Sequence, residues 1–186
     1  KGKENINRVM SETELDENGN EIEFVDKIIL KTNELKEELY DKIEDMVAQF
    51  YKKINVAHLD EIKALNEIYP NVPLLFNILG ACYKSKGDID AAAKMFKTAI
   101  TIKPDYAEAY FNLAVVTRGL GDLNSAIESY NKAISISPNY PDAYNNLGNC
   151  FKELGKFDEA IESYEWAIAY KHNFFHAYNN LGLTHV

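Results

Sequence analysis

A pattern of 34 residues occurs three times in this chain and begins a fourth time. The copies cover residues 73–106, 107–140 and 141–174, and residues 175–186 begin the next one. When each copy is numbered from place 1, an aromatic residue stands at place 4, a leucine at place 7 and a glycine at place 15. Such a period indicates one supersecondary unit used repeatedly, because a single unit cannot bury its apolar face without neighbours.

The spacing within each copy predicts a pair of helices. Places 4, 7, 8 and 11 are apolar or small and lie on one face at about 100° per residue. After the glycine, alanine at places 20 and 27 and an aromatic residue at place 24 allow two helices to approach with a ring between them. Pro104 and Pro138 then end the second helix, because proline has no amide hydrogen to donate.

These columns resemble the tetratricopeptide repeat, in which each unit is a helix, a tight turn and a second helix. The resemblance covers residues 73–186 and implies an all-α, right-handed superhelical solenoid of antiparallel helix pairs. It also implies that the first helices line a concave groove in which partner peptides lie. Residues 24–72 are expected to form an extra N-terminal helix and a degenerate capping repeat, and residues 1–23 a flexible acidic segment.

The net charge, the apolar runs and the two cysteines restrict the class of partner and the cellular compartment. The formal net charge is -9, which argues against nucleic acid or an anionic membrane as the main partner. No apolar run reaches the length of a membrane span, and no signal-peptide core is present. Cys82 and Cys150 share place 10 two repeats apart, too far to form a disulfide. We therefore expect buried thiols and a cytoplasmic protein.

Asparagine recurs on the face of the first helix that we expect to line the groove. Places 2, 6, 9 and 13 lie opposite the predicted buried stripe, and place 6 is Asn112, Asn146 and Asn180 in successive copies. A carboxamide both donates and accepts, so this row could bind the main chain of an extended peptide. The row is similar to the asparagine ladder in the tetratricopeptide arm of O-linked N-acetylglucosamine transferase. The alternative is that these amides bond locally or are solvated.

Other residues are expected to contribute to the same groove. They are Leu74, Asn77, Ile78, Glu108, Asp142 and Asn149. Leu74 and Ile78 would accept an apolar side chain, whereas the two carboxylates would favour a neutral or basic partner over an acidic one. The clamp by which some family members bind two carboxylates needs lysine or arginine on this face, and asparagine and acidic residues occupy the corresponding places.

Outside the groove, one tryptophan and two histidines are candidates for function. Trp166 should face outward from its second helix, where it could anchor a neighbouring domain or subunit, or pack beside Phe174. His172 and His176 are four residues apart, but a zinc site needs a further ligand. No phosphate-binding loop or nucleophile motif is present. We expect no metal, cofactor or catalytic residue.

The sequence therefore predicts a non-enzymatic protein-interaction scaffold that holds an extended peptide. Two alternatives stay open. The fourth copy stops inside its first helix, which would suit the substrate-recruiting arm of a larger transferase. Residues 24–54 carry a short heptad-like stripe, which would suit a structural assembly subunit that self-associates through that helix or through Trp166.

Overall fold

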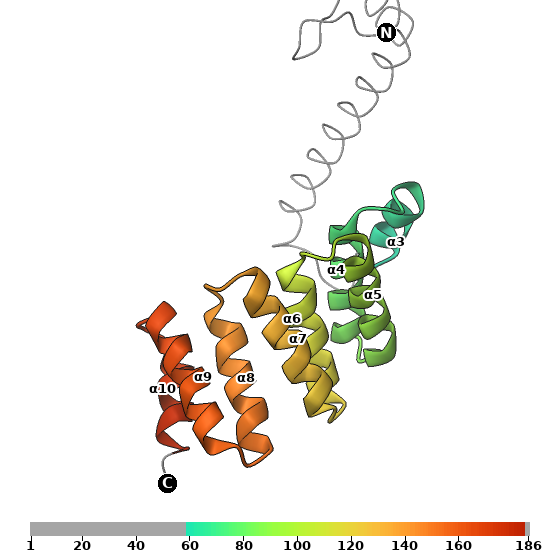
Figure 1. Ribbon diagram of the computed structural model, residues 1–186. Helices are drawn as coiled ribbons and strands as arrows, with labels where there is room; N and C mark the ends of the chain where they lie inside the picture. Colours follow the sequence, from blue (N-terminus) through green and yellow to red (C-terminus); the bar gives the residue numbers. More distant parts are fainter. Residues whose placement is uncertain (1–58, 185–186) are drawn as a thin grey trace, which may run out of the picture. The chain divides into compact units, whose positions relative to one another are not determined.

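The computed structural model describes residues 59–184, and within that range it contains helices and no strands. Three helix pairs follow one leading helix, and the first helix of a fourth pair ends the series (Figure 1). The helices are α3 (Leu59–Ile68), α4 (Pro73–Ser85), α5 (Ile89–Ile102), α6 (Ala107–Gly119), α7 (Leu123–Ile136), α8 (Pro141–Glu153), α9 (Phe157–Tyr170) and α10 (Phe175–Gly182). Each helix packs against the next along the chain, which gives the predicted solenoid of stacked pairs.

The helix boundaries follow the sequence period. In the three complete pairs the first helix has 13 residues and the second helix 14. The helices α4, α6, α8 and α10 begin at residues 73, 107, 141 and 175, which are 34 apart. The turn glycines have φ between 73° and 82°, a region that other residues rarely adopt. The helix α9 ends two residues before His172, as α5 and α7 end two residues before their prolines. The end of the second helix therefore does not depend on the proline.

The second helices supply the tightest part of the core. Places 20, 24 and 27 are 0% exposed in all three complete copies, as the spacing predicted. These residues are Ala92, Phe96, Ala99, Ala126, Tyr130, Ala133, Ala160, Tyr164 and Ala167. On the first helices the prediction was partly wrong, because places 3 and 10 are buried while the aromatic at place 4 stays partly exposed. Compared with the prediction, the buried stripe of each first helix is rotated toward the neighbouring repeat. The first helices of adjacent repeats also contact each other.

The third repeat lacks a helix cap that the other two have. The Asp88 carboxylate accepts a hydrogen bond from the Ala91 amide, and the Asp122 carboxylate accepts one from the Ser125 amide, both at 3.1 Å. Lys156 stands at this place before α9 and its side chain makes no such bond. We expect Lys156→Asp to raise the free energy of unfolding by about 0.5–2 kcal/mol in chemical denaturation, because it adds the cap. An unchanged or lower value would contradict this.

Other expectations fall partly or wholly outside residues 59–184. The acidic segment at residues 1–23 and the extra helix at residues 24–54 cannot be compared with the structure for this reason. The helix α3 covers the second half of the proposed degenerate repeat, in which Ile62 would stand at place 24 and Leu65 at place 27. Ile62 is buried and Leu65 is partly exposed, and the degenerate repeat stays a prediction. Both cysteines are buried and free, as predicted. Burial raises the pKa of the Cys150 thiol to about 11, which disfavours the reactive thiolate.

Candidate peptide-binding face on the first helices

The residues at places 2, 5, 6, 9, 12 and 13 lie on one side of each first helix, and this side is here called the first-helix face. Successive first helices contact each other, α4 with α6, α6 with α8 and α8 with α10. Polar side chains can therefore reach from one repeat to the next on this side. Three hydrogen-bonded pairs on this face join residues that are 35 apart, one repeat plus one residue.

A buried asparagine connects the first and second repeats. Asn77 is 0% exposed, and its Nδ2 donates to Oε1 of Glu108 at 3.1 Å. Its Oδ1 accepts from Nδ2 of Asn112 at 3.0 Å. Glu108 and Asn112 lie one turn apart on α6, so they hold the two ends of the Asn77 carboxamide. These contacts satisfy a polar group whose burial without partners would be costly.

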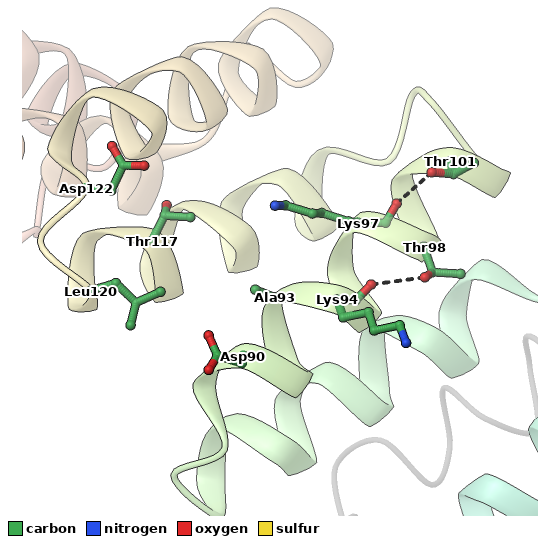
Figure 2. A pocket seen from close by; sticks show the side chains of 9 residues that line it. All are labelled: Asp90, Ala93, Lys94, Lys97, Thr98, Thr101, Thr117, Leu120 and Asp122. Carbon is green, nitrogen blue, oxygen red and sulfur yellow. Dashed lines mark hydrogen bonds between the residues drawn. The ribbon is translucent and has the colours of Figure 1, made fainter.

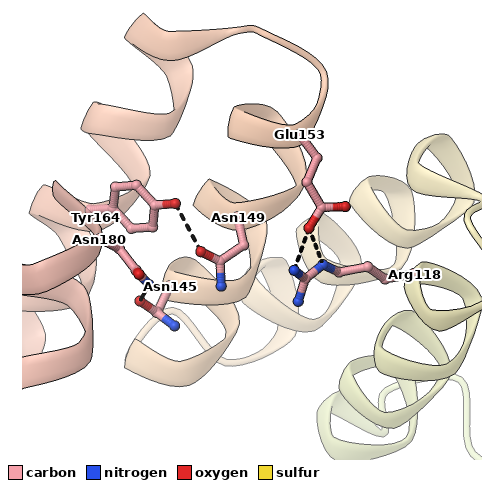
Figure 3. A network of polar contacts seen from close by, with 6 residues as sticks. All are labelled: Arg118, Asn145, Asn149, Glu153, Tyr164 and Asn180. Atoms are coloured by element: carbon pink, nitrogen blue, oxygen red, sulfur yellow. Dashed lines mark hydrogen bonds and ion pairs between the residues drawn. The ribbon is translucent and has the colours of Figure 1, made fainter. Parts of the chain in front are cut away.

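The same connection recurs between the third and fourth repeats. Nδ2 of Asn180 donates to Oδ1 of Asn145 at 3.0 Å, and Asn145 is only 8% exposed (Figure 3). Sequence reasoning missed Asn145, because it considered the helix face by itself and not the neighbouring repeat. Two of the three asparagines at place 6 thus make local bonds between repeats, which is the alternative considered for them above.

The middle of the face differs because Phe111 replaces the asparagine at place 5. Its ring stacks on Tyr140 at a centroid distance of 5.0 Å and cannot accept a hydrogen bond from Asn146. Asn146 lies instead near the buried hydroxyl of Tyr130. Burial raises the pKa of Tyr130 strongly, and the Asn146 carboxamide lowers it by a smaller amount. Even so, no residue in the described range lies in hydrogen-bonding geometry with this hydroxyl.

A related tyrosine has its partner in the third repeat. The Tyr164 hydroxyl donates to Oδ1 of Asn149 at 2.9 Å (Figure 3), and burial raises the pKa of Tyr164 to about 12. Val115 stands at the place of Asn149 in the second repeat, which explains why the Tyr130 hydroxyl lacks an equivalent partner. The tyrosine at place 24 thus reaches the first-helix face from the second helix behind it.

An ion pair lies at the end of the same face. Nε of Arg118 on α6 donates to Oε1 of Glu153 on α8 at 3.1 Å, and the Arg118 terminal nitrogen contacts the same oxygen (Figure 3). Burial works to lower the pKa of Arg118, but Glu153 outweighs it and the net shift is upward. Arg118 was not among the predicted groove residues. A pairing at a separation of 35 residues is the signal in the sequence that could have identified it.

The remaining predicted groove residues differ in exposure. Leu74, Glu108, Asn112, Asn149 and Asn180 are partly exposed, and Asp142 is exposed. Asn77 is 0% and Ile78 only 1% exposed, so the predictions that Asn77 lines the groove and that Ile78 accepts an incoming side chain were wrong. The reason is that α4 is buried around most of its circumference, including the four consecutive residues 77–80.

Trp166 belongs to an aromatic cluster on another side of the third repeat. Its ring stacks on Tyr144 and Tyr170 at centroid distances of 6.2 and 6.0 Å, and 48% of the residue is exposed. It was expected either to face outward or to pack beside Phe174. The exposed position agrees with the first expectation, and the ring stacks on two aromatic side chains of its own repeat.

A separate open recess of about 520 Å³ lies between α5 and the turn joining α6 to α7 (Figure 2). Asp90, Lys94 and Lys97 of α5 line the recess together with Asp122, so two negative and two positive charges balance. The hydroxyls of Thr98 and Thr101 donate to carbonyls of their own helix, and Asp122 caps α7. These polar groups are occupied locally, which makes the recess a weaker candidate than the first-helix face.

In residues 59–184, no three His, Cys, Asp or Glu side chains come together in a way that could hold a metal ion. No helix in this range is both long and apolar enough to cross a membrane.

The fold and this face define an all-α repeat protein of the kind that serves as an interaction scaffold. The family model described as TPR repeat matches residues 80–117 and 118–155, and the one described as tetratricopeptide repeat matches residues 141–174. Together they span about half of the chain. The chain belongs to the tetratricopeptide repeat family.

Solved structures agree with this assignment. One crystal structure of MamA is 30% identical, covers 68% of this chain and 74% of MamA, and has a TM-score of 0.65. A second MamA structure is 28% identical, covers 80% of both chains and has the same TM-score of 0.65. The first TPR of Spaghetti (RPAP3), bound to the HSP90 peptide SRMEEVD, is 25% identical over 61% of this chain and 90% of that one, with a TM-score of 0.60. A search of curated proteins finds no match.

Proposed function

We propose that this chain is a scaffold that holds an extended segment of another protein on its first-helix face. The observation that carries the proposal is the row of carboxamides on this face, which crosses the repeats and remains partly exposed. Carboxamides bind main-chain groups whatever the side chains of the partner are. A similar domain, that of Spaghetti, binds a peptide, which supports the same use here.

The charges on this face favour a neutral or basic segment. Asp142 is exposed and Glu108 is partly exposed in the first turns of their helices, and Arg118 is already paired with Glu153. The other cations of the face, Lys84 and Lys152, stand in the last turns of α4 and α8, at the opposite end of the face from the two carboxylates. An acidic peptide such as SRMEEVD would need cations that are free to pair with its carboxylates. We therefore expect the partner to differ in charge from the peptide bound by Spaghetti.

The test is selection of binding peptides from a random twelve-residue display library on the full chain. Enriched peptides are labelled and their affinities measured by fluorescence anisotropy, and amide shifts in a ¹H–¹⁵N spectrum map the contact. We expect enriched peptides to be neutral or basic and the shifts to fall on α6, α8 and α10. A scrambled pool of acidic peptides serves as the control and should bind at least about tenfold more weakly.

The single tryptophan gives an independent readout. Because Trp166 stacks on Tyr144 and Tyr170 and not on the first-helix face, its emission should stay unchanged when a peptide binds. A large change in Trp166 emission, or shifts confined to α5, α7 and α9, would contradict the proposal. So would the failure of any peptide to be enriched.

A further inference from the structure

The three rings around Trp166 form a layer and not a column. The centroids of Trp166, Tyr144 and Tyr170 are 6.2, 6.0 and 5.6 Å apart in pairs, and the ring planes differ by 22–27°. In a column of three parallel rings the outer two would lie about 7 Å apart or more, twice the contact distance of carbon atoms. The rings are therefore displaced sideways, and this set is here called the aromatic layer. Trp166 is 48% and Tyr170 38% exposed, so the layer presents ring surface to solvent.

Packing between repeats does not use this side of the third repeat. In residues 59–184 the second helices pack on the first helices of their own repeat and of the next one, and they make no comparable contact with each other. The earlier repeats have no such layer, because Thr98 and Lys132 stand at the place of Trp166. The aromatic layer is therefore peculiar to the third repeat and is not part of the packing that all repeats share.

The helix that carries Trp166 and Tyr170 is strongly acidic. Along α9 there are four carboxylates and no basic residue, whereas α5 has one acidic and two basic residues and α7 has one of each. The four carboxylates belong to Asp158, Glu159, Glu162 and Glu165. All four are exposed, and none forms an ion pair within the described part of the chain. Charges of one sign without counter-charges favour a cationic partner.

Two of these carboxylates lie on the same side of α9 as the Trp166 ring. At 100° per residue, Glu162 is about 40° and Glu159 about 20° from Trp166 around the helix, and Tyr170 is about 40° away on the other side. The last turn of α9 contains no basic residue, so the partial negative charge at the helix C-terminus also favours a cation there. Lys171, which follows α9, has its Nζ 4.6 Å from the ring centroid of Phe174 and is engaged there.

The combination of flat rings and carboxylates suits arginine better than other groups. A guanidinium is planar, stacks on aromatic faces and presents several N–H donors at once. Carboxylates accept such hydrogen bonds, which charge makes stronger. A lysine ammonium would use the charges but would not match the flat ring surface. A proline or a sugar ring would use the rings but not the carboxylates.

We propose that this side of α9 is a second binding site, which takes an arginine-containing segment of a partner protein. The guanidinium lies on the ring of Trp166, and Tyr170 and Tyr144 extend the surface beneath the segment. Glu162, one turn before Trp166, accepts from the guanidinium N–H groups. The site is separate from the first-helix face and does not depend on the function proposed there.

The probe is a fluorescein-labelled twelve-residue peptide of glycine, serine and arginine, with matched peptides that carry lysine or citrulline in place of arginine. Citrulline keeps the planar side chain and removes its charge. On the full chain the arginine peptide should change the emission of Trp166, the single tryptophan, and shift the amides of α9. The lysine peptide should bind about two- to fivefold more weakly, and the citrulline peptide more weakly than the lysine peptide.

Two pairs of variants test the ring and the carboxylate separately by fluorescence anisotropy. Trp166→Leu should weaken binding of the arginine peptide about two- to fivefold, whereas Phe157→Leu, at an exposed aromatic residue in the first turn of the same helix, should leave it unchanged. Glu162→Gln should weaken it about two- to threefold at low ionic strength, whereas Glu128→Gln, at the same place of α7, should not. All four positions are exposed, so each variant should fold, which circular dichroism checks.

Every other outcome overturns the inference. Equal binding of the arginine and citrulline peptides would mean that charge is not recognised, and full binding by Trp166→Leu would mean that the ring is not contacted. Absence of binding by the arginine peptide would remove the site. A concentration-dependent dimer that is lost in Trp166→Ala would assign the aromatic layer to a second copy of the chain. Shifts confined to α6, α8 and α10, with Trp166 emission unchanged, would place the peptide on the first-helix face and so support the proposed function alone.

Discussion

Replacing Phe96 by alanine is expected to lower the free energy of unfolding by about 3–5 kcal/mol, the usual cost of removing a fully buried aromatic side chain. The ring is 0% exposed and packs in one cluster with Ala92 of its own helix and with Leu113 and Val116 of the next repeat. Its removal leaves a cavity at the junction of two repeats. Because each repeat depends on its neighbours, the loss should also broaden the unfolding transition.

Denaturant unfolding followed by circular dichroism measures this effect. The matched control is Phe175→Ala, since Phe175 is 80% exposed and should change stability by less than about 0.5 kcal/mol. A loss below about 1 kcal/mol for Phe96→Ala would mean that the rings at place 24 do not hold the repeats together as the packing indicates.

Substitution of Gly148 by alanine should cost about 1–3 kcal/mol through overpacking. A Cβ at Gly148 would lie 2.6 Å from the buried ring of Tyr164, closer than nonbonded carbons approach. The second repeat has Ala114 at this place, where the methyl group is accommodated and fully buried. The cost of Gly148→Ala is therefore the cost of moving α8 and α9 apart to make the same room. A single added methyl group would therefore disturb the packing of α8 against α9.

Gly182 provides the control at the same place in the fourth copy. Gly182 is exposed, and nothing in residues 59–184 lies within 4 Å of a Cβ built there. Gly182→Ala should leave stability unchanged or raise it by up to about 1 kcal/mol, since alanine favours helix. Equal effects of the two substitutions in thermal unfolding would rule out the close approach of helix and ring as the cause.

The sequence period predicted most of the fold. Helix ends, turn glycines and the residues at places 20, 24 and 27 all recur at a fixed interval. Each copy therefore supports the helix and core assignments made for the others. The exposure of Ile78 was predicted wrongly because angular position on one helix says nothing of how many neighbours surround that helix. α4 has neighbours on more than one side.

The candidate site was predicted only in part, for a related reason. The row of asparagines at place 6 was visible in the sequence, but its partners lie at place 5 of the preceding repeat. Which places meet depends on the offset between adjacent repeats. The pattern of one helix does not contain that offset. The common separation of 35 residues in Asn77 with Asn112, Asn145 with Asn180 and Arg118 with Glu153 could have indicated it.

Two alternative functions stay predictions. The transferase-arm interpretation needs a catalytic domain, and the assembly interpretation needs self-association through residues 24–54 or the exposed side of Trp166. Analytical ultracentrifugation of wild type and Trp166→Ala tests the second. A concentration-dependent dimer lost in the variant would support it, and a monomer in both would remove the tryptophan from consideration.

The most direct test of the central claim is a crystal structure of the chain with a library-selected peptide bound. The account predicts an extended peptide across the first helices, with its main-chain groups within about 2.7–3.2 Å of carboxamides of the first-helix face. It also predicts that the bonds from Asn112 to Asn77 and from Asn180 to Asn145 persist. A peptide seated against Trp166, or in the recess beside α5, would contradict the assignment of function to the first-helix face.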